Sequence, residues 1–276
     1  MQHEIDCHGL TDRGLSRPSN QDQFLVADLV KTLRIDDSSL NVDAHRRISG
    51  NSQGKLMLVA DGMGGHSAGE RASKLAIETI STYVLNTLHW FFRLEADREH
   101  DFESELMASL ELCNRQIREE AEVVPGERGM GTTVTMAYLI WPRLYVVHAG
   151  DSRCYVYHES GLKRITEDHT FAEQLVNAGV LSPENADQSR WSNVLWNVVG
   201  GSEEDLHPVV YKCELAKGDT VLLCTDGLTR HLGDKQIEQV LSSAGSRSAK
   251  DICQQLIDDA LTGGGKDNVT AIVARV

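Results

Sequence analysis

Three very short connections between neighbouring apolar runs constrain the fold of this chain more than any other feature. Between Thr133 and Ile165, successive runs are separated only by the sequences WPR, AGDSR and HESG. Connections of this length can join only antiparallel neighbours, because a parallel pair needs a crossover of about a dozen residues or more. We therefore predict an antiparallel meander for this part of the chain.

Other short runs rich in Val, Leu, Tyr or Thr are bounded by Gly, Asp or Pro, which is typical of strands. Including the meander, the predicted strands are Phe24–Asp28, Leu56–Ala60, Thr133–Ile140, Leu144–His148, Cys154–Tyr157, Leu162–Ile165, Val209–Cys213, Val221–Thr225 and Val269–Val273.

Apolar residues at the helical spacing of 3.6 predict three amphipathic helices. These stripes cover Ala68–Tyr83, Phe102–Ile117 and Ala249–Ala260. We expect Ser67 to cap the first helix and the glycine run that begins at Gly263 to end the third. A shorter helix is expected over Lys235–Leu241, with Asp234 as its N-cap.

Antiparallel strands and helices that occur in separate blocks predict an α+β fold class. Because the chain has neither an internal repeat nor a Pro/Ser-rich linker, we expect residues 1–276 to form a single domain. The polar stretch Lys31–Gly54 is interpreted as a long loop or small insertion. A second irregular stretch, Phe171–Gly201, begins with a predicted short helix over Phe171–Ala178.

The balance of charge excludes some classes of partner. The chain has 41 acidic and 27 basic side chains, a formal net charge of −14. Proteins that bind nucleic acid or anionic lipid through their general field need clustered Lys and Arg, so we expect neither partner. Small phosphorylated substrates stay possible, because a few buried cations or metals can reverse the field locally.

The N-terminus and the cysteines favour a cytosolic protein. The opening sequence MQHEIDCHGL has no apolar core of a secretory signal, and no stretch approaches 18 uninterrupted apolar residues. The six cysteines lie far apart and never form a CxxC pair. In a chain of this length, that scatter is typical of reduced thiols rather than of disulfides or a zinc site.

Aspartates occur where predicted strands end. Asp61, Asp151 and Asp226 each follow a strand, and Asp267 stands just before the last one. In an antiparallel sheet the end of one strand lies beside the start of its neighbour, so these four carboxylates can meet on one rim.

Two interpretations of this pattern stay open from the residues alone. Asp-Gly is a common turn dipeptide after a strand. Alternatively, carboxylates about 4 Å apart repel by about 4 kcal/mol at an effective dielectric constant of 20, unless they share protons or bind a cation. A purely carboxylate ligand set suits Mg²⁺ or Mn²⁺, and a pair of these ions can hold a hydroxide and clamp a phosphoryl group.

Six short motifs in a fixed order add a family resemblance. They are RPSNQD at Arg17–Asp22, DGMGGH at Asp61–His66, GTT at Gly131–Thr133, GDSR at Gly150–Arg153, DGL at Asp226–Leu228 and DNVT at Asp267–Thr270. In this order the motifs closely resemble the metal-dependent protein phosphatases (the PPM, or type 2C, family) in their bacterial serine/threonine form. The resemblance implies a β-sandwich of two antiparallel sheets flanked by helix pairs, with two Mn²⁺ or Mg²⁺ ions at one end.

The resemblance also implies a set of metal ligands. Asp61 corresponds to the carboxylate that bridges both metals, and the carbonyl of Gly62 to a ligand of the first. Asp226 and Asp267 correspond to the remaining ligands of the second metal. Asp151 corresponds to a ligand of a third, weaker metal found in bacterial members.

Three more residues receive roles by the same resemblance. Asp22 corresponds to the residue that holds metal-bound water. Arg17 corresponds to the arginine that grips the substrate phosphate, a task for which the planar guanidinium suits two oxygens at once. Asn268 is expected to orient Asp267 or a water molecule.

The sequence departs from the family pattern in places. Met63 stands where eukaryotic members have a histidine that serves as general acid, and His66 either substitutes for it or packs at the start of a helix. Gln21 stands where many members have Glu. The stretch Phe171–Gly201 falls where the family has a flap that influences substrate choice, and His169 is expected to be structural there.

The implied activity is hydrolysis of phosphoserine and phosphothreonine in proteins, with hydroxide that bridges the two metals attacking phosphorus. A serine/threonine kinase is the implied counterpart. Two alternatives are a catalytically silent sensor or binding module on the same fold and a metal-dependent small-molecule phosphatase or phosphodiesterase.

Overall fold

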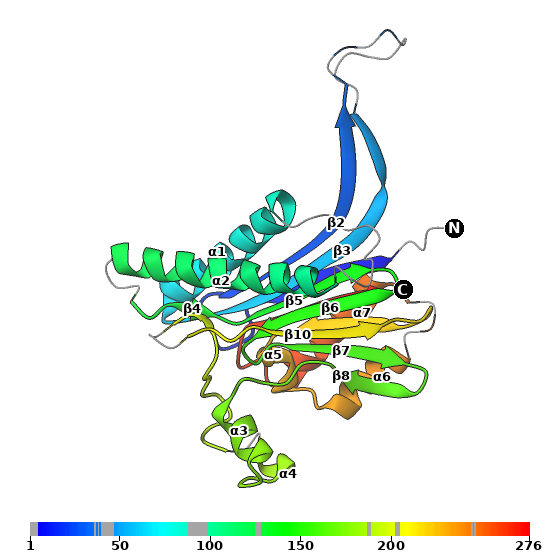
Figure 1. Cartoon of the computed structure of the whole chain (residues 1–276). Helices are drawn as coiled ribbons and strands as arrows, with labels where there is room; N and C mark the ends of the chain where they lie inside the picture. Colours follow the sequence, from blue (N-terminus) through cyan, green and yellow to red (C-terminus); the bar gives the residue numbers. More distant parts are fainter. Residues whose placement is uncertain are drawn as a thin grey trace.

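In the computed structural model, the strands form two antiparallel sheets (Figure 1). The structure describes residues 5–35, 37, 39, 47–87, 99–124, 128–186, 189–201, 205–243, 245 and 247–276. One sheet has the order β1 (Asp6–Asp12), β12 (Val269–Arg275), β11 (Thr220–Cys224), β7 (Arg153–His158) and β8 (Gly161–Arg164). The other has the order β10 (Val209–Glu214), β6 (Arg143–Ala149), β5 (Val134–Ile140), β3 (Arg47–Met63), β4 (Gly131–Thr132) and β9 (Val199–Gly200), with β2 (Asp22–Arg34) paired to β3.

Strand β3 shows why the two sheets stack. Leu56, Leu58 and Ala60 belong to the apolar cluster under the helices, whereas Met57 and Val59 belong to the cluster between the sheets. Side chains alternate across a strand, so a strand that is buried on both faces is apolar at every position. The run Leu56–Ala60 is therefore continuously apolar because it lies in the middle of the molecule.

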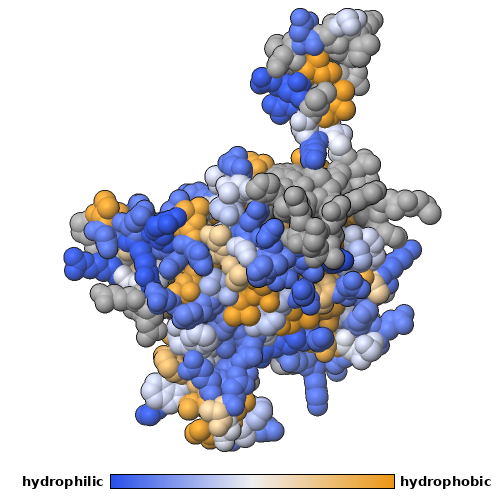
Figure 2. Space-filling view, viewed as in Figure 1, coloured by the Kyte–Doolittle hydropathy of each residue, from blue (hydrophilic) through white to orange (hydrophobic). Residues whose placement is uncertain are grey.

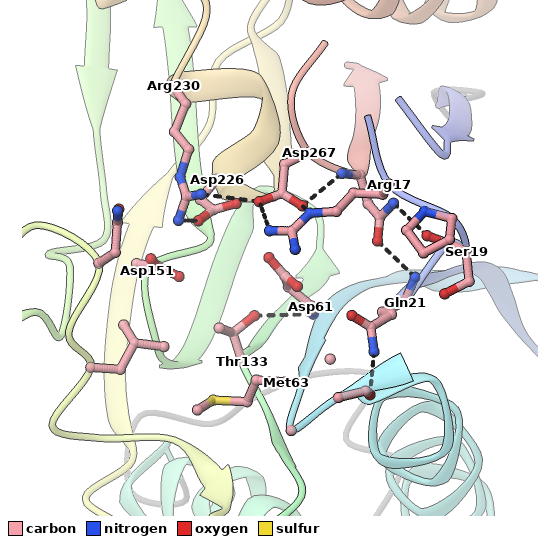
Figure 3. A pocket seen from close by; sticks show the side chains of 17 residues that line it. Arg17, Ser19, Gln21, Asp61, Met63, Thr133, Asp151, Asp226, Arg230 and Asp267 are labelled. Atoms are coloured by element: carbon pink, nitrogen blue, oxygen red, sulfur yellow. Dashed lines mark hydrogen bonds and ion pairs between the residues drawn. The ribbon is translucent and has the colours of Figure 1, made fainter. Parts of the chain in front are cut away.

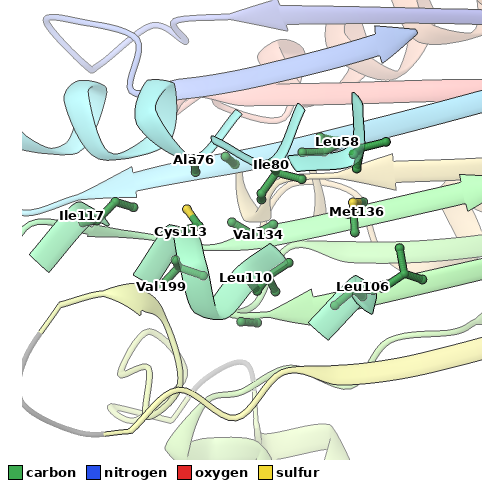
Figure 4. Packing of buried hydrophobic residues seen from close by; sticks show 14 of the residues in the cluster. Leu58, Ala76, Ile80, Leu106, Leu110, Cys113, Ile117, Val134, Met136 and Val199 are labelled. Carbon is green, nitrogen blue, oxygen red and sulfur yellow. The ribbon is translucent and has the colours of Figure 1, made fainter. Parts of the chain in front are cut away.

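Helix pairs cover the outer faces of the sandwich. The helices are α1 (His66–Asn86) and α2 (Glu99–Val123) on the β3–β5–β6 sheet, and α6 (Asp234–Ser242) and α7 (Ala249–Thr262) on the β11–β12 sheet. Figure 4 shows the first interface, where Ile80 of α1 and Leu110 of α2 point toward the sheet. Truncating either fully buried side chain to Ala would cost about 2–5 kcal/mol. The expected α+β sandwich with flanking helix pairs is confirmed.

The predicted meander is wrong at its centre. Strands β5 and β6 are neighbours, and so are β7 and β8, but the link from β6 to β7 crosses from one sheet to the other. Gly150 makes this crossing with φ +120°, and a Cβ at this position would lie 2.5 Å from the Thr133 side chain. A short connection can therefore join two packed sheets as well as two paired strands. The crossing puts Asp151 at the end of the sandwich.

The predicted loop Lys31–Gly54 is also wrong in its described parts. Strands β2 and β3 continue through it as a two-stranded arm that projects from the body (Figure 1). Thr32 pairs with Ser49 and Arg34 with Arg47, and the Thr32 and Ser49 hydroxyl oxygens lie 3.2 Å apart. The stretch is polar because the arm has no core to cover, and the ladder of backbone hydrogen bonds does not require apolar side chains. Residues 36, 38 and 40–46 lie outside the described part.

The surface of the arm mixes polar and apolar side chains. Val30 and Ile48 are 37% and 49% exposed. Figure 2 shows hydrophobic and hydrophilic residues side by side on the projecting arm. The alternation that marks a half-buried strand is therefore missing from this part of the sequence, which explains the incorrect interpretation as a loop.

The bounds of α6 and α7 were predicted to within about two residues, whereas α1 and α2 extend beyond their predicted stripes at both ends. Helix α7 ends before Gly263, as expected, and follows the N-cap Ser248, which was not predicted. Helix α1 instead follows Gly65 rather than Ser67, and α6 follows Gly233 with Asp234 in its first turn. Strand β1 was not predicted. It lies at the edge of its sheet and is only partly buried, so its sequence is polar and lacks the apolar run typical of the inner strands.

The segment Phe171–Gly201 lies at the same end of the sandwich as the β6–β7 link and extends away from it (Figure 1). It contains α3 (Phe171–Asn177), which confirms the predicted short helix, and α4 (Pro183–Ala186). Among the described helices, none combines the length and apolar character needed to cross a membrane.

Candidate active site

The four strand-end aspartates line one cavity of about 340 Å³ at the end of the sandwich (Figure 3). Asp61 lies near the end of β3 in one sheet, while Asp267 precedes β12 in the other. Asp151 comes from the link between the sheets, and Asp226 begins the short helix α5 (Asp226–Thr229), which was not predicted. The expected meeting of these carboxylates is confirmed. Arg17 lines the same cavity.

Asp22 is a buried carboxylate directly behind this cavity. It is 1% exposed and pairs across the strands with Asp61, so two like charges face each other. Its Oδ2 accepts hydrogen bonds from the hydroxyls of Thr225 at 2.8 Å and Thr270 at 2.7 Å. Its Oδ1 has no hydrogen-bond partner. Burial raises the pKa of Asp22 to about 7, although the hydrogen bonds from the two hydroxyls lower the pKa.

Asp61 is positioned by its backbone. Its N–H donates to the Thr133 hydroxyl at 3.1 Å, and its carbonyl accepts from the Thr133 N–H at 2.9 Å. The following residue, Gly62, lies so close to α1 that a Cβ would stand 2.0 Å from the Gly69 carbonyl oxygen. Burial, followed by the charge of Asp22, raises the pKa of Asp61 well above its ordinary value.

Burial likewise raises the pKa of Asp151 well above its ordinary value, with the charge of Asp226 as the next cause. The pKa of Asp226 is also raised by burial, although the nearby Arg230 opposes the shift. The shared cause is the removal of several carboxylates from water at one place. A cation in this cavity would relieve that cost.

Two arginines meet these carboxylates. Arg17 donates from Nε and Nη2 to the two oxygens of Asp267, both at 2.7 Å. Arg230 donates from Nη1 to Asp267 Oδ2 at 3.0 Å and forms an ion pair with Asp226 through Nη2. The pairing of Arg17 with Asp267 was not anticipated. Arg230 was missed altogether, although its place four residues after Asp226, on the same face of a helix, is a readable signal.

The Asn268 side chain makes contacts that were not predicted. Its side chain accepts from the Gln21 N–H at 2.8 Å and donates to the carbonyls of Arg13 at 2.7 Å and Ser19 at 2.9 Å. Only its backbone N–H reaches Asp267, at 2.9 Å. The amide therefore fastens the segment that carries Arg17 to the start of β12, because one Asn can donate and accept at once.

Gln21 is part of the same support. Its side-chain amide donates to the Gly65 carbonyl at 2.7 Å, and its own carbonyl accepts from the Ser73 hydroxyl at 2.6 Å. These contacts join the start of β2 to α1. Met63 lines the cavity and is 38% exposed, whereas the His66 side chain lies outside the described part.

The predicted flap does border the cavity, which Asn193 and Leu195 help to line. His169 at its base is 4% exposed, and its Nδ1 accepts from the Gly150 N–H at 3.1 Å and lies 2.9 Å from the Asn197 amide. The histidine thus ties the flap to the turn beside Asp151. Its predicted structural role is confirmed.

The residues present fit hard divalent cations. The donors are carboxylate and carbonyl oxygens, and the buried Oδ1 atoms of Asp22 and Asp226 lack hydrogen-bond partners. Across the described residues, no cluster of three or more His, Cys, Asp or Glu side chains is already arranged to hold an ion. Instead, Asp226 and Asp267 are engaged by Arg17 and Arg230.

Comparison with known proteins gives consistent matches. The family model described as protein phosphatase 2C matches residues 32–262. The serine/threonine protein phosphatase PstP of Mycobacterium tuberculosis is 36% identical over 223 residues, which is 80% of this chain but only 40% of that protein. The serine/threonine phosphatase stp of Listeria welshimeri is 32% identical, with 79% of this chain and 83% of that protein covered.

Solved structures agree with these relatives. The catalytic domain of the serine threonine protein phosphatase PstP, solved in complex with two manganese ions, superposes with a TM-score of 0.74 at 30% identity. The match covers 98% of this chain and 97% of that one. The likeness therefore extends over the whole sandwich.

Proposed function

Because this chain belongs to the protein phosphatase 2C family, we propose that it hydrolyses phosphoserine and phosphothreonine in proteins with the help of two Mn²⁺ or Mg²⁺ ions. One observation carries the proposal: four aspartates from both sheets line a single cavity with Arg17 beside them. A silent sensor module on this fold would not need to retain these buried, mutually repelling carboxylates.

The proposed ligands are those that the family resemblance implies, and their oxygen donors suit these ions. Asp61 and the Gly62 carbonyl would hold the first ion, and Asp61 would also contribute to the second. Asp226 and Asp267 would be the remaining ligands of the second ion, and Asp151 would hold a third, weaker one. When bound, such ions supply a nucleophile from water and neutralise the phosphoryl oxygens. Manganese in the PstP catalytic domain supports this ion chemistry.

The residues around the ions orient the reactants. Arg17 is half exposed at the cavity mouth, and its planar guanidinium suits two phosphate oxygens once it leaves Asp267. Asp22 stands behind Asp61 with Oδ1 unpartnered, where it can accept a hydrogen bond from a water molecule. The Thr225 and Thr270 hydroxyls fix its other oxygen, so Oδ1 keeps its direction.

The flap next to the cavity is proposed to influence substrate choice through Asn193 and Leu195. A serine/threonine kinase is the proposed counterpart that supplies the phosphorylated proteins. The cytosol is the proposed location, supported by the described cysteines, which are free thiols in the structure.

A panel of substrates tests the activity. We expect phosphate release from phosphoserine and phosphothreonine peptides in Mn²⁺, and much slower release from nucleotides and sugar phosphates. Asp267→Asn is expected to abolish most of this release, whereas Asp258→Asn, on the exposed face of α7, is expected to retain it. Faster release from nucleotides or sugar phosphates would instead favour a small-molecule phosphatase or phosphodiesterase.

A further inference from the structure

Arg230 places a positive charge beside two of the proposed metal ligands. Its guanidinium bridges two of the proposed ligands, through Nη1 to Asp267 and through Nη2 to Asp226 (Figure 3). The Asp226 side chain is only 10% exposed, and that of Asp267 15%. A positive group between two such carboxylates offsets the repulsion that buried like charges cause.

The contacts of Asp267 show what a cation must displace. Oδ1 accepts from Arg17 Nε at 2.7 Å and from the Asn268 N–H at 2.9 Å. Oδ2 accepts from Arg17 Nη2 at 2.7 Å and from Arg230 Nη1 at 3.0 Å. Each oxygen therefore has two donors already. An ion can bind this carboxylate only if at least one arginine withdraws.

Arg230 is the arginine placed to withdraw from both ligands together. Arg230 follows the last residue of α5, and its backbone N–H donates to the Asp226 carbonyl at 2.8 Å, so the backbone stays in place while the side chain turns. The side chain is 37% exposed and lines both the main cavity and a neighbouring one of about 170 Å³. That second cavity is also lined by Glu173, a carboxylate that can receive the displaced guanidinium.

We propose that Arg230 is an internal counter-ion that competes with the metal for Asp226 and Asp267. It neutralises both carboxylates in the metal-free protein and gives up its contacts with them when the ions bind. This inference rests on the proposed ligand roles of the two aspartates. As a result, Arg230 stabilises the metal-free protein and weakens metal binding, because its contacts with the two aspartates are lost when the ions bind.

The test measures metal binding directly. Chelator-treated protein is titrated with Mn²⁺, and free Mn²⁺ is followed by electron paramagnetic resonance. Arg230→Ala and Arg230→Gln are expected to bind Mn²⁺ at least about tenfold more tightly, the weight of one charge-assisted hydrogen bond. The melting temperature of each metal-free variant is expected to fall, since the repulsion is no longer offset. Gln retains most of the side-chain volume without the charge. If the Ala variant does not fold, Mn²⁺ binding can therefore still be measured in the Gln variant.

Two comparisons complete the design. Arg71→Ala removes an arginine that pairs with Glu120 between α1 and α2, and it is expected to leave Mn²⁺ affinity unchanged. Unchanged or weaker Mn²⁺ binding in both Arg230 variants would overturn the proposal, because a merely structural arginine gives that result. Asp226→Asn tests the ligand role of Asp226 separately from the proposal for Arg230. Loss of Mn²⁺ binding there supports its ligand role, and wild-type binding would refute the ligand assignment itself, whatever the Arg230 variants do.

Discussion

Asp22→Asn is expected to stabilise the metal-free protein, even though it removes a group from the active site. Burial raises the pKa of Asp22 from 3.8 to about 7. The folded state therefore holds this proton more tightly than the unfolded chain does. The stabilisation of the fold by this bound proton is complete below about pH 4. It is lost as the pH rises to about 7, because the carboxylate must then ionise inside the protein.

The size of the effect follows from that shift. About three pKa units at about 1.4 kcal/mol each give a penalty of about 4 kcal/mol above pH 7. Asn removes this penalty, and its carbonyl can still accept from Thr225 and Thr270. Its amide, however, takes the place of the unpartnered Oδ1, at a cost of about 1–3 kcal/mol. The expected net gain above pH 7 is about 1–3 kcal/mol.

Urea denaturation of chelator-treated protein measures this gain. The difference in unfolding free energy between Asp22→Asn and wild type is expected to be larger at about pH 8 than at about pH 5.5, by about 2 kcal/mol. Glu159→Gln, which removes an exposed carboxylate from the β7–β8 turn, is the control for net charge. Equal or lower stability of Asp22→Asn at pH 8, or a gain that does not depend on pH, would refute the reasoning.

Three further predictions concern other residues. Asp226→Asn and Asp267→Asn keep side-chain volume but remove ligand charge, so kcat for a phosphopeptide is expected to fall at least about 100-fold; near-normal turnover would remove that residue from the metal site. Arg17→Ala is expected to lower kcat/KM about 10- to 150-fold, mainly through KM, with partial recovery in Arg17→Lys; unchanged kinetics at saturating Mn²⁺ would exclude the phosphate contact. Burial lowers the pKa of His148 to about 3, so its contribution to stability is complete above about pH 6.5 and is lost as the pH falls toward 3. In urea denaturation His148→Gln should therefore flatten the acid slope by up to about 1.4 kcal/mol per pH unit, and an unchanged slope would assign the acid sensitivity to other groups.

Local pattern was enough to predict much of the fold. The run Leu56–Ala60, with Asp61 directly after it, predicted both a buried strand and the position of a carboxylate that lines the cavity. The helix α7 was predicted because its apolar stripe and its terminal glycines agree. In these segments the same residues determine local structure and packing, which makes them readable without a structure.

Features that depend on distant partners were not predictable in this way. The crossing at Gly150 looks like any tight turn until the second sheet is present. The arm formed by β2 and β3 lacks alternation, since neither face covers a core. The Asn268 amide has three partners in the segment Arg13–Gln21, about 250 residues away in the sequence, so no local pattern reveals them. The ion pair between Arg230 and Asp226 is an exception, because the spacing of four residues is visible in the sequence.

The cavity lined by the four aspartates is proposed to be a metal-dependent phosphatase site. The most direct test is phosphate release from a phosphothreonine peptide by chelator-treated protein, before and after Mn²⁺ is restored. We expect no release above background without the ion, recovery when Mn²⁺ is added, and a melting temperature that rises with the same Mn²⁺ concentrations. Phosphate release that persists after exhaustive chelation would contradict the account.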